Sequence, residues 1–186
     1  MDLVFFGIQG SGKGTQAKRL AAEFGYDIFE AGGELRKIAA MGSELGNTVK
    51  SYIDAGNLVP HPIIMQVVKE AIAKRPSSQK ILFDGIPRDQ DQQRDFDTIM
   101  AQAGRDFHAI EFLLDAEEAK KRILGRAKAE GRADDANDAV IARRMATFEQ
   151  KTRPVISVYR AAGILKEIDA DQSVEKVYSE LRTMAT

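Results

Sequence analysis

The sequence predicts an α/β fold, in which helices cover both faces of a central parallel sheet. Short, nearly continuous apolar runs recur along the chain, and segments with the apolar spacing of helices separate them. Runs of this kind are typical of strands that are buried on both faces. The length of 186 residues suits one domain, 1–186, with small insertions.

Four buried strands are expected at 3–6, 81–83, 110–114 and 164–168, and a shorter one at 27–29 completes a five-stranded sheet. Three segments place apolar residues on one helical face: positions 17, 20, 21 and 24, positions 64, 67, 68, 71 and 72, and positions 174, 177, 178 and 181. We expect these stripes to face the core.

Two stretches between strands are predicted to leave this core. Residues 32–75 are long for one crossover and contain breaks at glycines 42, 46 and 56 and at prolines 60 and 62, which predicts three short helices. Residues 129–137 include the run Glu-Gly-Arg-Ala-Asp-Asp, which is too polar to be buried. We expect both stretches to be small excursions from a single domain.

A glycine-rich turn links the first strand to the first helix, and it reads Gly7-Ile8-Gln9-Gly10-Ser11-Gly12-Lys13-Gly14-Thr15. Glycines allow successive N–H groups to converge on an anion, the helix N-terminus contributes its positive dipole end, and Lys13 adds a mobile cation. The alternative, a structural turn with a solvated lysine, is less consistent with the strand–loop–helix context. The predicted fold class is therefore a three-layer P-loop α/β/α fold that binds a nucleoside triphosphate at this loop.

Magnesium is expected to bind indirectly. Many P-loops carry Ser or Thr after the lysine, where the hydroxyl binds Mg²⁺, but this chain has Gly14 there and Thr15 one residue later. We therefore expect phosphates and waters to hold Mg²⁺, with no direct side-chain ligand.

The composition excludes several other classes of function. The net charge of −1 gives no general affinity for nucleic acid or an anionic membrane. The chain has no cysteine, which excludes disulfides, thiolate catalysis and a cysteine-based zinc site, and its two histidines cannot alone bind a metal. Without a long apolar stretch or a leader before the first strand, we expect a cytoplasmic protein.

Polar residues follow the strand predicted at 81–83, where ligands bind in an open parallel sheet. Asp84 is placed to orient the water shell of Mg²⁺, and Arg88 to bind a phosphate as a fork. Gln92 is expected on the same helical face as Arg88, where its amide can pair with a base edge. Taken alone, Asp84 could equally be a helix cap and Arg88 a solvated surface group.

Several motifs together resemble the adenylate kinases of the nucleoside monophosphate kinase family. The motifs are Lys13-Gly14-Thr15-Gln16, Gly42-Ser43-Glu44-Leu45-Gly46, Ala55-Gly56-Asn57-Leu58-Val59, Asp84-Gly85-Ile86-Pro87-Arg88 and Gly131-Arg132-Ala133-Asp134-Asp135. The resemblance implies reversible phosphoryl transfer from MgATP to AMP by a monomer. It also implies a monophosphate-binding subdomain at 31–60 and a lid at 127–137 of the short form, which needs no zinc.

The resemblance assigns roles to individual residues. The donor ATP would be bound by Gly10, Ser11, Gly12, Lys13, Gly14 and Thr15, with Arg122 on its adenine and Arg126 on its phosphates. The catalytic set would be Lys13, Asp84, Arg88, Arg132 and Arg144. The acceptor site would be Ala31, Gly32, Arg36, Val59, Gly85, Arg88, Gln92 and Arg144 or its neighbour Arg143.

The choice between these two arginines depends on the direction of counting. Counting forward from Asp134 and Asp135 selects Arg143, whereas counting back from Thr152 and Pro154 selects Arg144. We favour Arg144, because loops accept insertions more readily than helices.

The acceptor motif departs from the family pattern. Family members usually have threonine, glycine and aspartate where this chain has Ala31-Gly32-Gly33. Alanine resembles the UMP/CMP kinases, whereas Gln92 resembles the adenylate kinases. We expect a preference for AMP with tolerance for CMP or UMP, because a lost hydrogen bond of about 0.5–1.5 kcal/mol broadens specificity without reversing it.

Three alternatives stay open at this point. The first is a UMP/CMP or broad-specificity nucleoside monophosphate kinase, and the second is a P-loop kinase for another small acceptor. The third is a nucleotide-binding regulator without turnover, although a binder needs no ring of charges around a transferring phosphoryl group.

Overall fold

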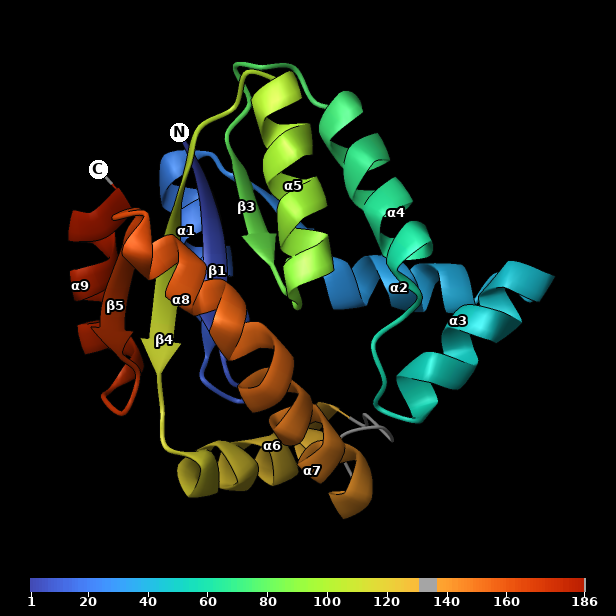
Figure 1. The fold of residues 1–186 in the computed structure, drawn as a ribbon. Helices are drawn as coiled ribbons and strands as arrows, with labels where there is room; N and C mark the ends of the chain where they lie inside the picture. Colours follow the sequence, from blue (N-terminus) through green and yellow to red (C-terminus); the bar gives the residue numbers. More distant parts are fainter. Residues whose placement is uncertain (131–136, 186) are drawn as a thin grey trace.

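The computed structural model describes residues 1–130 and 137–185, and of residues 126–130 it describes the backbone alone. Its sheet has five parallel strands in the order β2-β3-β1-β4-β5 (Figure 1). The strands are β1 Asp2–Gly7, β2 Asp27–Glu30, β3 Ile81–Asp84, β4 Phe107–Leu113 and β5 Leu165–Asp169. The predicted parallel five-stranded sheet is confirmed, with shifts of one to three residues at strand ends.

Helices pack on both faces of this sheet, α1 and α9 on one face and α4, α5 and α8 on the other. The helices of the described residues are α1 Lys13–Phe24, α2 Ala31–Ala39, α3 Glu44–Asp54, α4 His61–Ala73, α5 Gln90–Gln102, α6 Ala116–Glu130, α7 Asp138–Thr147, α8 Arg153–Ala161 and α9 Val174–Ala185. A π-helical turn, Phe148–Thr152, joins α7 to α8. The predicted excursion at 32–75 forms three helices, α2, α3 and α4.

The side chains of the buried strand β1 point alternately to the two faces of the sheet and contribute to a hydrophobic core on each face. Val4 and Phe6 pack with residues of α4, α5 and α8 on one face of the sheet. Leu3 and Phe5 pack with α1 and α9 on the other. Successive side chains of a strand point to opposite faces, so a fully apolar strand requires both cores. The structure is therefore the predicted three-layer arrangement.

The two edges of the sheet differ in character. At the amino edge, Asp2 is bound by Arg105, with Oδ2 2.6 Å from Nε and Oδ1 3.0 Å from Nη2, and Oδ1 also accepts the Ile81 N–H at 2.8 Å. At the carboxyl edge, β1, β2 and β3 end in Gly7, Glu30 and Asp84. Buried polar groups close the first edge, and the second is open to ligands.

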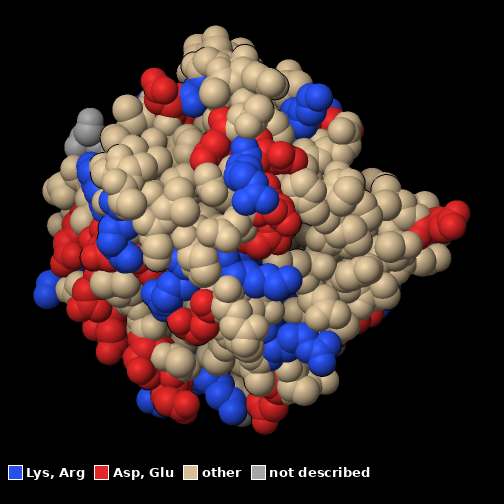
Figure 2. All heavy atoms as spheres, viewed as in Figure 1, with Lys and Arg blue, Asp and Glu red and all other residues tan. Residues whose placement is uncertain are grey.

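The surface has no dominant charge on the face in view. Acidic and basic side chains are interspersed there (Figure 2), as expected for a net charge of −1. Among the described residues, no helix is both long and apolar enough to cross a membrane.

Candidate active site

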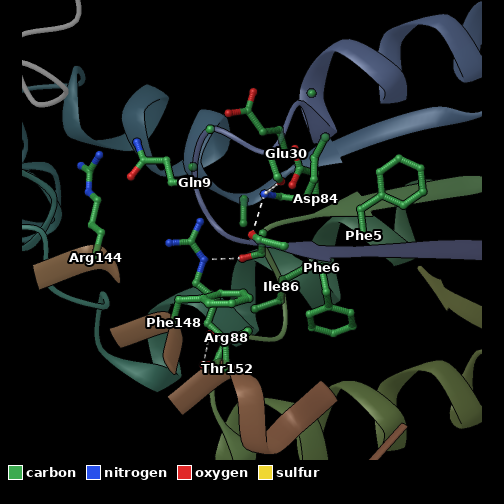
Figure 3. Close-up of a pocket in the computed structure, with 18 of the residues that line it drawn as sticks. Phe5, Phe6, Gln9, Glu30, Asp84, Ile86, Arg88, Arg144, Phe148 and Thr152 are labelled. Carbon is green, nitrogen blue, oxygen red and sulfur yellow. Dashed lines mark hydrogen bonds between the residues drawn. The ribbon is translucent and has the colours of Figure 1, made fainter. Parts of the chain in front are cut away.

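A cleft of about 600 Å³ lies at the carboxyl edge of the sheet. Its lining comes from the loop after β1, the segments after β2 and β3, the end of α3, the α7–α8 junction and the segment between β5 and α9. Figure 3 shows side chains from these segments converging on one space. This is where ligands bind in open parallel sheets, and the volume fits small-molecule substrates.

The glycine-rich loop wraps the N-terminus of α1. Gly7, Gly10 and Gly12 have positive φ angles of 148°, 89° and 88°, and Gly12 offers α1 no side-chain cap. A Cβ on Gly10 would lie 2.6 Å from the Ala119 carbonyl oxygen, so the loop also runs too close to α6 for a larger residue. No side chain caps this end of α1, and the N-terminus of a helix favours an anion through its N–H groups and its dipole.

Lys13 lies across this loop. Its Nζ donates to the carbonyl oxygens of Gly7 at 2.7 Å and Ile8 at 3.2 Å and to Ser11 Oγ at 3.4 Å. The ammonium is therefore held over the loop, and the reading of Lys13 as a freely solvated surface group is wrong.

Asp84, the last residue of β3, faces the start of α1. A Cβ built on Gly14 would be 3.9 Å from Asp84 Oδ2, so the carboxylate lies beside the position where many P-loops place a hydroxyl. Carboxylate oxygen is a ligand type that Mg²⁺ prefers, directly or through water. Asp84 caps no described helix, because α5 begins six residues later and is capped by Asp89.

Arg88 is fixed by its own loop. Its Nε donates to the Gly85 carbonyl oxygen at 2.8 Å, its backbone N–H donates to Gln92 Oε1 at 2.8 Å, and its carbonyl oxygen accepts from Thr152 Oγ1 at 2.8 Å. Gly85 has a φ of +83°, and a Cβ there would lie 2.8 Å from Arg88 Nη2. Only glycine leaves room for this arginine at the end of β3.

The expectation that Arg88 and Gln92 share a helical face is wrong, because α5 begins only at Gln90. The two residues meet instead through the bond from the Arg88 backbone to the Gln92 amide oxygen. Gln92 is 3% exposed and lines the cleft. With Oε1 occupied, its Nε2 is the end of the amide suited to donate to a base.

Three arginines converge on the cleft. Although solvent reaches Arg88 through the mouth of the cleft, burial lowers the pKa of its guanidinium. The negative charge of Asp84 and, more weakly, that of Glu30 raise this pKa, whereas Arg144 and Arg36 lower it. An arginine keeps its proton despite such shifts, so three positive charges share this space and favour a polyanionic ligand.

The structure separates the two candidate arginines of α7. Arg144 lines the cleft, with Nη2 3.4 Å from the Ile53 carbonyl oxygen. Arg143 is not part of the lining, and its Nη1 donates to the Ala55 carbonyl oxygen at 3.1 Å. Figure 3 shows Arg144 on the side of the cleft opposite Asp84.

Arg122, predicted to lie on the donor side, lines the cleft. Its Nε binds Glu118 at 2.9 Å, its Nη1 the Ala170 carbonyl oxygen at 3.0 Å and its Nη2 Asp171 at 3.2 Å. These three bonds fix the plane of the guanidinium. Of the other predicted donor-side arginines, Arg132 lies outside the described residues, as does the side chain of Arg126.

The remaining predicted residues line the same cleft. They are Gly10, Ser11, Gly12, Gly14 and Thr15 from the loop, and Ala31, Gly32, Arg36, Val59 and Gly85 from the predicted acceptor side. Sequence reasoning missed other lining residues, among them Glu30, Phe148 and Thr152. Glu30 follows a predicted strand directly, and the rule that led to Asp84 would have found it.

The five-stranded parallel sheet and the glycine-rich loop at the start of α1 define a P-loop α/β fold, with the cleft at the carboxyl ends of the strands. A family model described as adenylate kinase matches residues 5–164. The chain is 36% identical to an adenylate kinase from Thermus thermophilus over 97% of this chain and 94% of the relative. It is 36% identical to one from Maricaulis maris over 95% and 94%, and 35% identical to one from a Synechococcus strain over 98% and 94%. The chain belongs to the adenylate kinase family.

Proposed function

We propose that this protein catalyses reversible phosphoryl transfer from MgATP to AMP, giving two ADP, with the site residues in the roles described below. The observation that carries the proposal is the convergence of Arg36, Arg88 and Arg144 on the cleft that also contains Lys13 and its loop. Phosphoryl transfer demands positioning and charge neutralisation more than covalent chemistry. A ring of cations around the space between two nucleotides meets that demand.

On the donor side, the glycine loop and the N-terminus of α1 hold the β- and γ-phosphates. Lys13, held over the loop by the Gly7 and Ile8 carbonyl oxygens, exchanges these contacts for phosphate oxygens. Arg122, fixed by three bonds, presents its planar face to the adenine. The proposed roles of Arg126 and Arg132, from the family resemblance, are phosphate binding and lid-borne neutralisation.

Magnesium fits this site through Asp84. The carboxylate lies beside Gly14, at the start of α1, where the outer phosphates are proposed to bind. Among the described residues, no group of three or more His, Asp or Glu side chains is placed to hold a metal ion. We propose that phosphates and waters hold Mg²⁺. When bound, Mg²⁺ neutralises charge on the donor phosphates, and Asp84 orients its water shell.

On the acceptor side, Arg36, Arg88 and Arg144 bind the monophosphate, and the base lies near Ala31, Val59 and Gln92. Gln92 Oε1 is occupied by the Arg88 N–H, so Nε2 donates to the base. Adenine has an unprotonated ring nitrogen beside its amino group, and this ring nitrogen accepts the hydrogen bond from Nε2. The bond between Gln92 and the Arg88 backbone therefore couples recognition of the base to the position of the arginine that binds the phosphate.

We further propose that 31–60 is the acceptor-binding subdomain and 127–137 the short lid. The end of segment 31–60 contacts α7, the helix that follows segment 127–137. A Cβ on Gly56 would be 3.1 Å from Val140 Cγ1, and Arg143 donates to the Ala55 carbonyl oxygen. Because one chain supplies both sides of the cleft, we propose that the protein acts as a monomer. We also propose the cytoplasmic location expected from the sequence.

Initial rates with AMP, CMP, UMP and GMP, at fixed ATP and magnesium, test the acceptor assignment. AMP should be the fastest, with measurable rates for CMP or UMP, and a clear preference for CMP or UMP would overturn the AMP assignment. Ala31 is 2% exposed and lines the cleft, so Ala31→Thr should narrow the choice towards AMP. Ala101→Thr on the exposed face of α5 serves as the control, and unchanged selectivity in Ala31→Thr would place Ala31 away from the base.

A further inference from the structure

Glu30, the last residue of β2, places a second carboxylate in the cleft. It lies in register with Asp84, the last residue of β3, so the two side chains leave the same face of adjacent strands. Figure 3 shows both near the glycine loop. Glu30 Oε1 accepts a hydrogen bond from Arg36 Nη2 at 2.7 Å, and about half of each side chain is exposed.

Two glycines of α2 leave the space in which this carboxylate lies. A Cβ on Gly33 would be 3.1 Å from Glu30 Oε2 and 3.4 Å from its Cδ. A Cβ on Gly32 would be 3.1 Å from Arg36 Nη1 and 3.7 Å from Glu30 Oε1. Gly33 has ordinary helical φ, so the backbone does not require glycine there. A side chain at position 33 would require the Glu30 carboxylate to shift.

Position 33 is also where the acceptor motif of the family usually carries aspartate. This chain has Gly33 at that position, and the carboxylate of Glu30 occupies the space beside it. We propose that Glu30 is the positioning residue of the acceptor site, and that it holds Arg36 ready for the acceptor phosphate. The inference rests on the proposed function, because it assigns Arg36 to that phosphate.

The charges around Arg36 explain the need for such a residue. Arg36 and Arg144 both act on Arg88 as like charges, so both repel the guanidinium group of Arg88. Glu30 counters this repulsion and restricts the Arg36 side chain, which an acceptor would otherwise have to order on binding. A guanidinium has five N–H donors, and the contact with Glu30 uses one nitrogen, so Arg36 can bind phosphate at the same time.

Three variants and their acceptor kinetics test this role: Glu30→Ala, Gly33→Asp and the double variant. Glu30→Ala should raise the KM for AMP about tenfold, with kcat and the KM for ATP changed less than about twofold, since a positioned charge pair is lost on the acceptor side only. Gly33→Asp alone should also raise the KM for AMP, because its carboxylate would meet Glu30 at close range. The double variant should have a lower KM than either single variant, because the new aspartate then enters the space that Glu30 vacates.

Two controls separate charge from folding. Glu30→Gln keeps the shape without the charge and should give an intermediate KM, and it remains informative if Glu30→Ala does not fold. Glu34→Ala removes a neighbouring carboxylate that pairs with Lys37 outside the cleft and should leave the KM unchanged.

An unchanged KM for AMP in Glu30→Gln and Glu30→Ala, or additive effects in a folded double variant, would overturn the inference while the proposed function stands. A wild-type protein that does not phosphorylate AMP would overturn the proposed function itself. The two failures are therefore distinguishable.

Discussion

Lys13 illustrates how one side chain can stabilise a loop and serve chemistry. Its ammonium donates hydrogen bonds to the carbonyl oxygens of Gly7 and Ile8 within the glycine-rich loop. A triphosphate would offer stronger acceptors in the same place. The lysine is therefore poised over the phosphates before they arrive, which limits the reorganisation that binding requires.

Replacing Lys13 with methionine should lower kcat by about 10²–10³, because the variant loses a preorganised charge at the transferring group. The length of the side chain is retained, so the protein should stay folded. Steady-state kinetics with ATP and AMP measure the effect, and Lys69→Met on the exposed side of α4 is the control. A kcat within about twofold of the wild type would remove Lys13 from the catalytic set.

Which residues line the cleft could be predicted where a residue of suitable chemistry directly follows a recognisable strand or loop motif. Asp84 and Arg88 follow a recognisable strand, and Gly14 follows the lysine of a recognisable loop. The bond between Gln92 and the Arg88 backbone could not be foreseen, because it depends on where α5 begins. Glu30 directly follows a predicted strand, so its place in the cleft could have been predicted by the rule that selected Asp84. Its contact with Arg36, six positions later, could not, because it depends on the fold of α2.

The π-helical turn between α7 and α8 shapes the floor of the cleft. Phe148 and Thr152 both line the cleft, and Thr152 Oγ1 donates to the Arg88 carbonyl oxygen at 2.8 Å. π-Helical turns often mark functional sites, because the extra residue redirects side chains. The sequence 148–152, Phe-Glu-Gln-Lys-Thr, carries no local signal for this turn, since hydrophobic spacing does not distinguish it from an α-helix.

Replacing Thr152 with valine tests the contribution of this element. Valine keeps the shape of the side chain but removes the donor to Arg88, so the KM for AMP should rise about twofold to tenfold, in line with one lost hydrogen bond. Thr152→Ser keeps the hydroxyl and should stay close to the wild type, and the KM for ATP should be unchanged in both. Equal KM values in the valine and serine variants would show that the turn does not position Arg88.

The whole fold could be predicted because its strongest signal is periodic. Apolar strands such as 3–6 require cover on both faces, and the helical stripes supply it on the two sides found in the structure. The expectation that Val174 faces the core is wrong: it is the first residue of α9, lines the cleft and is 49% exposed. The order of the strands was not predictable, because it depends on pairings between residues as distant as Leu3 and Leu82. Neither was the closure of the amino edge, where Asp2 and Arg105 are far apart in sequence.

That amino edge yields a prediction about the stability of the molecule. The side chains of Asp2 and Arg105 are 4% and 5% exposed, and Asp2 also accepts the Ile81 N–H. Arg105→Met leaves a buried carboxylate without its counter-charge and should destabilise the protein by about 3–5 kcal/mol. For a chain of this length, that corresponds to a fall in Tm of roughly 6–20 °C.

Thermal unfolding of three variants measures this effect. Arg94→Met removes a pair with Asp91 whose side chains are 66% and 70% exposed, and it should cost less than about 1 kcal/mol. The double variant Asp2→Asn with Arg105→Met should recover part of the stability lost in Arg105→Met, because no buried charge is left unpaired. The pair lies at the edge opposite the cleft, so the kcat of Arg105→Met below its Tm should match the wild type. If Arg105→Met and Arg94→Met lowered Tm equally, burial would not explain the contribution of the Asp2–Arg105 pair to stability.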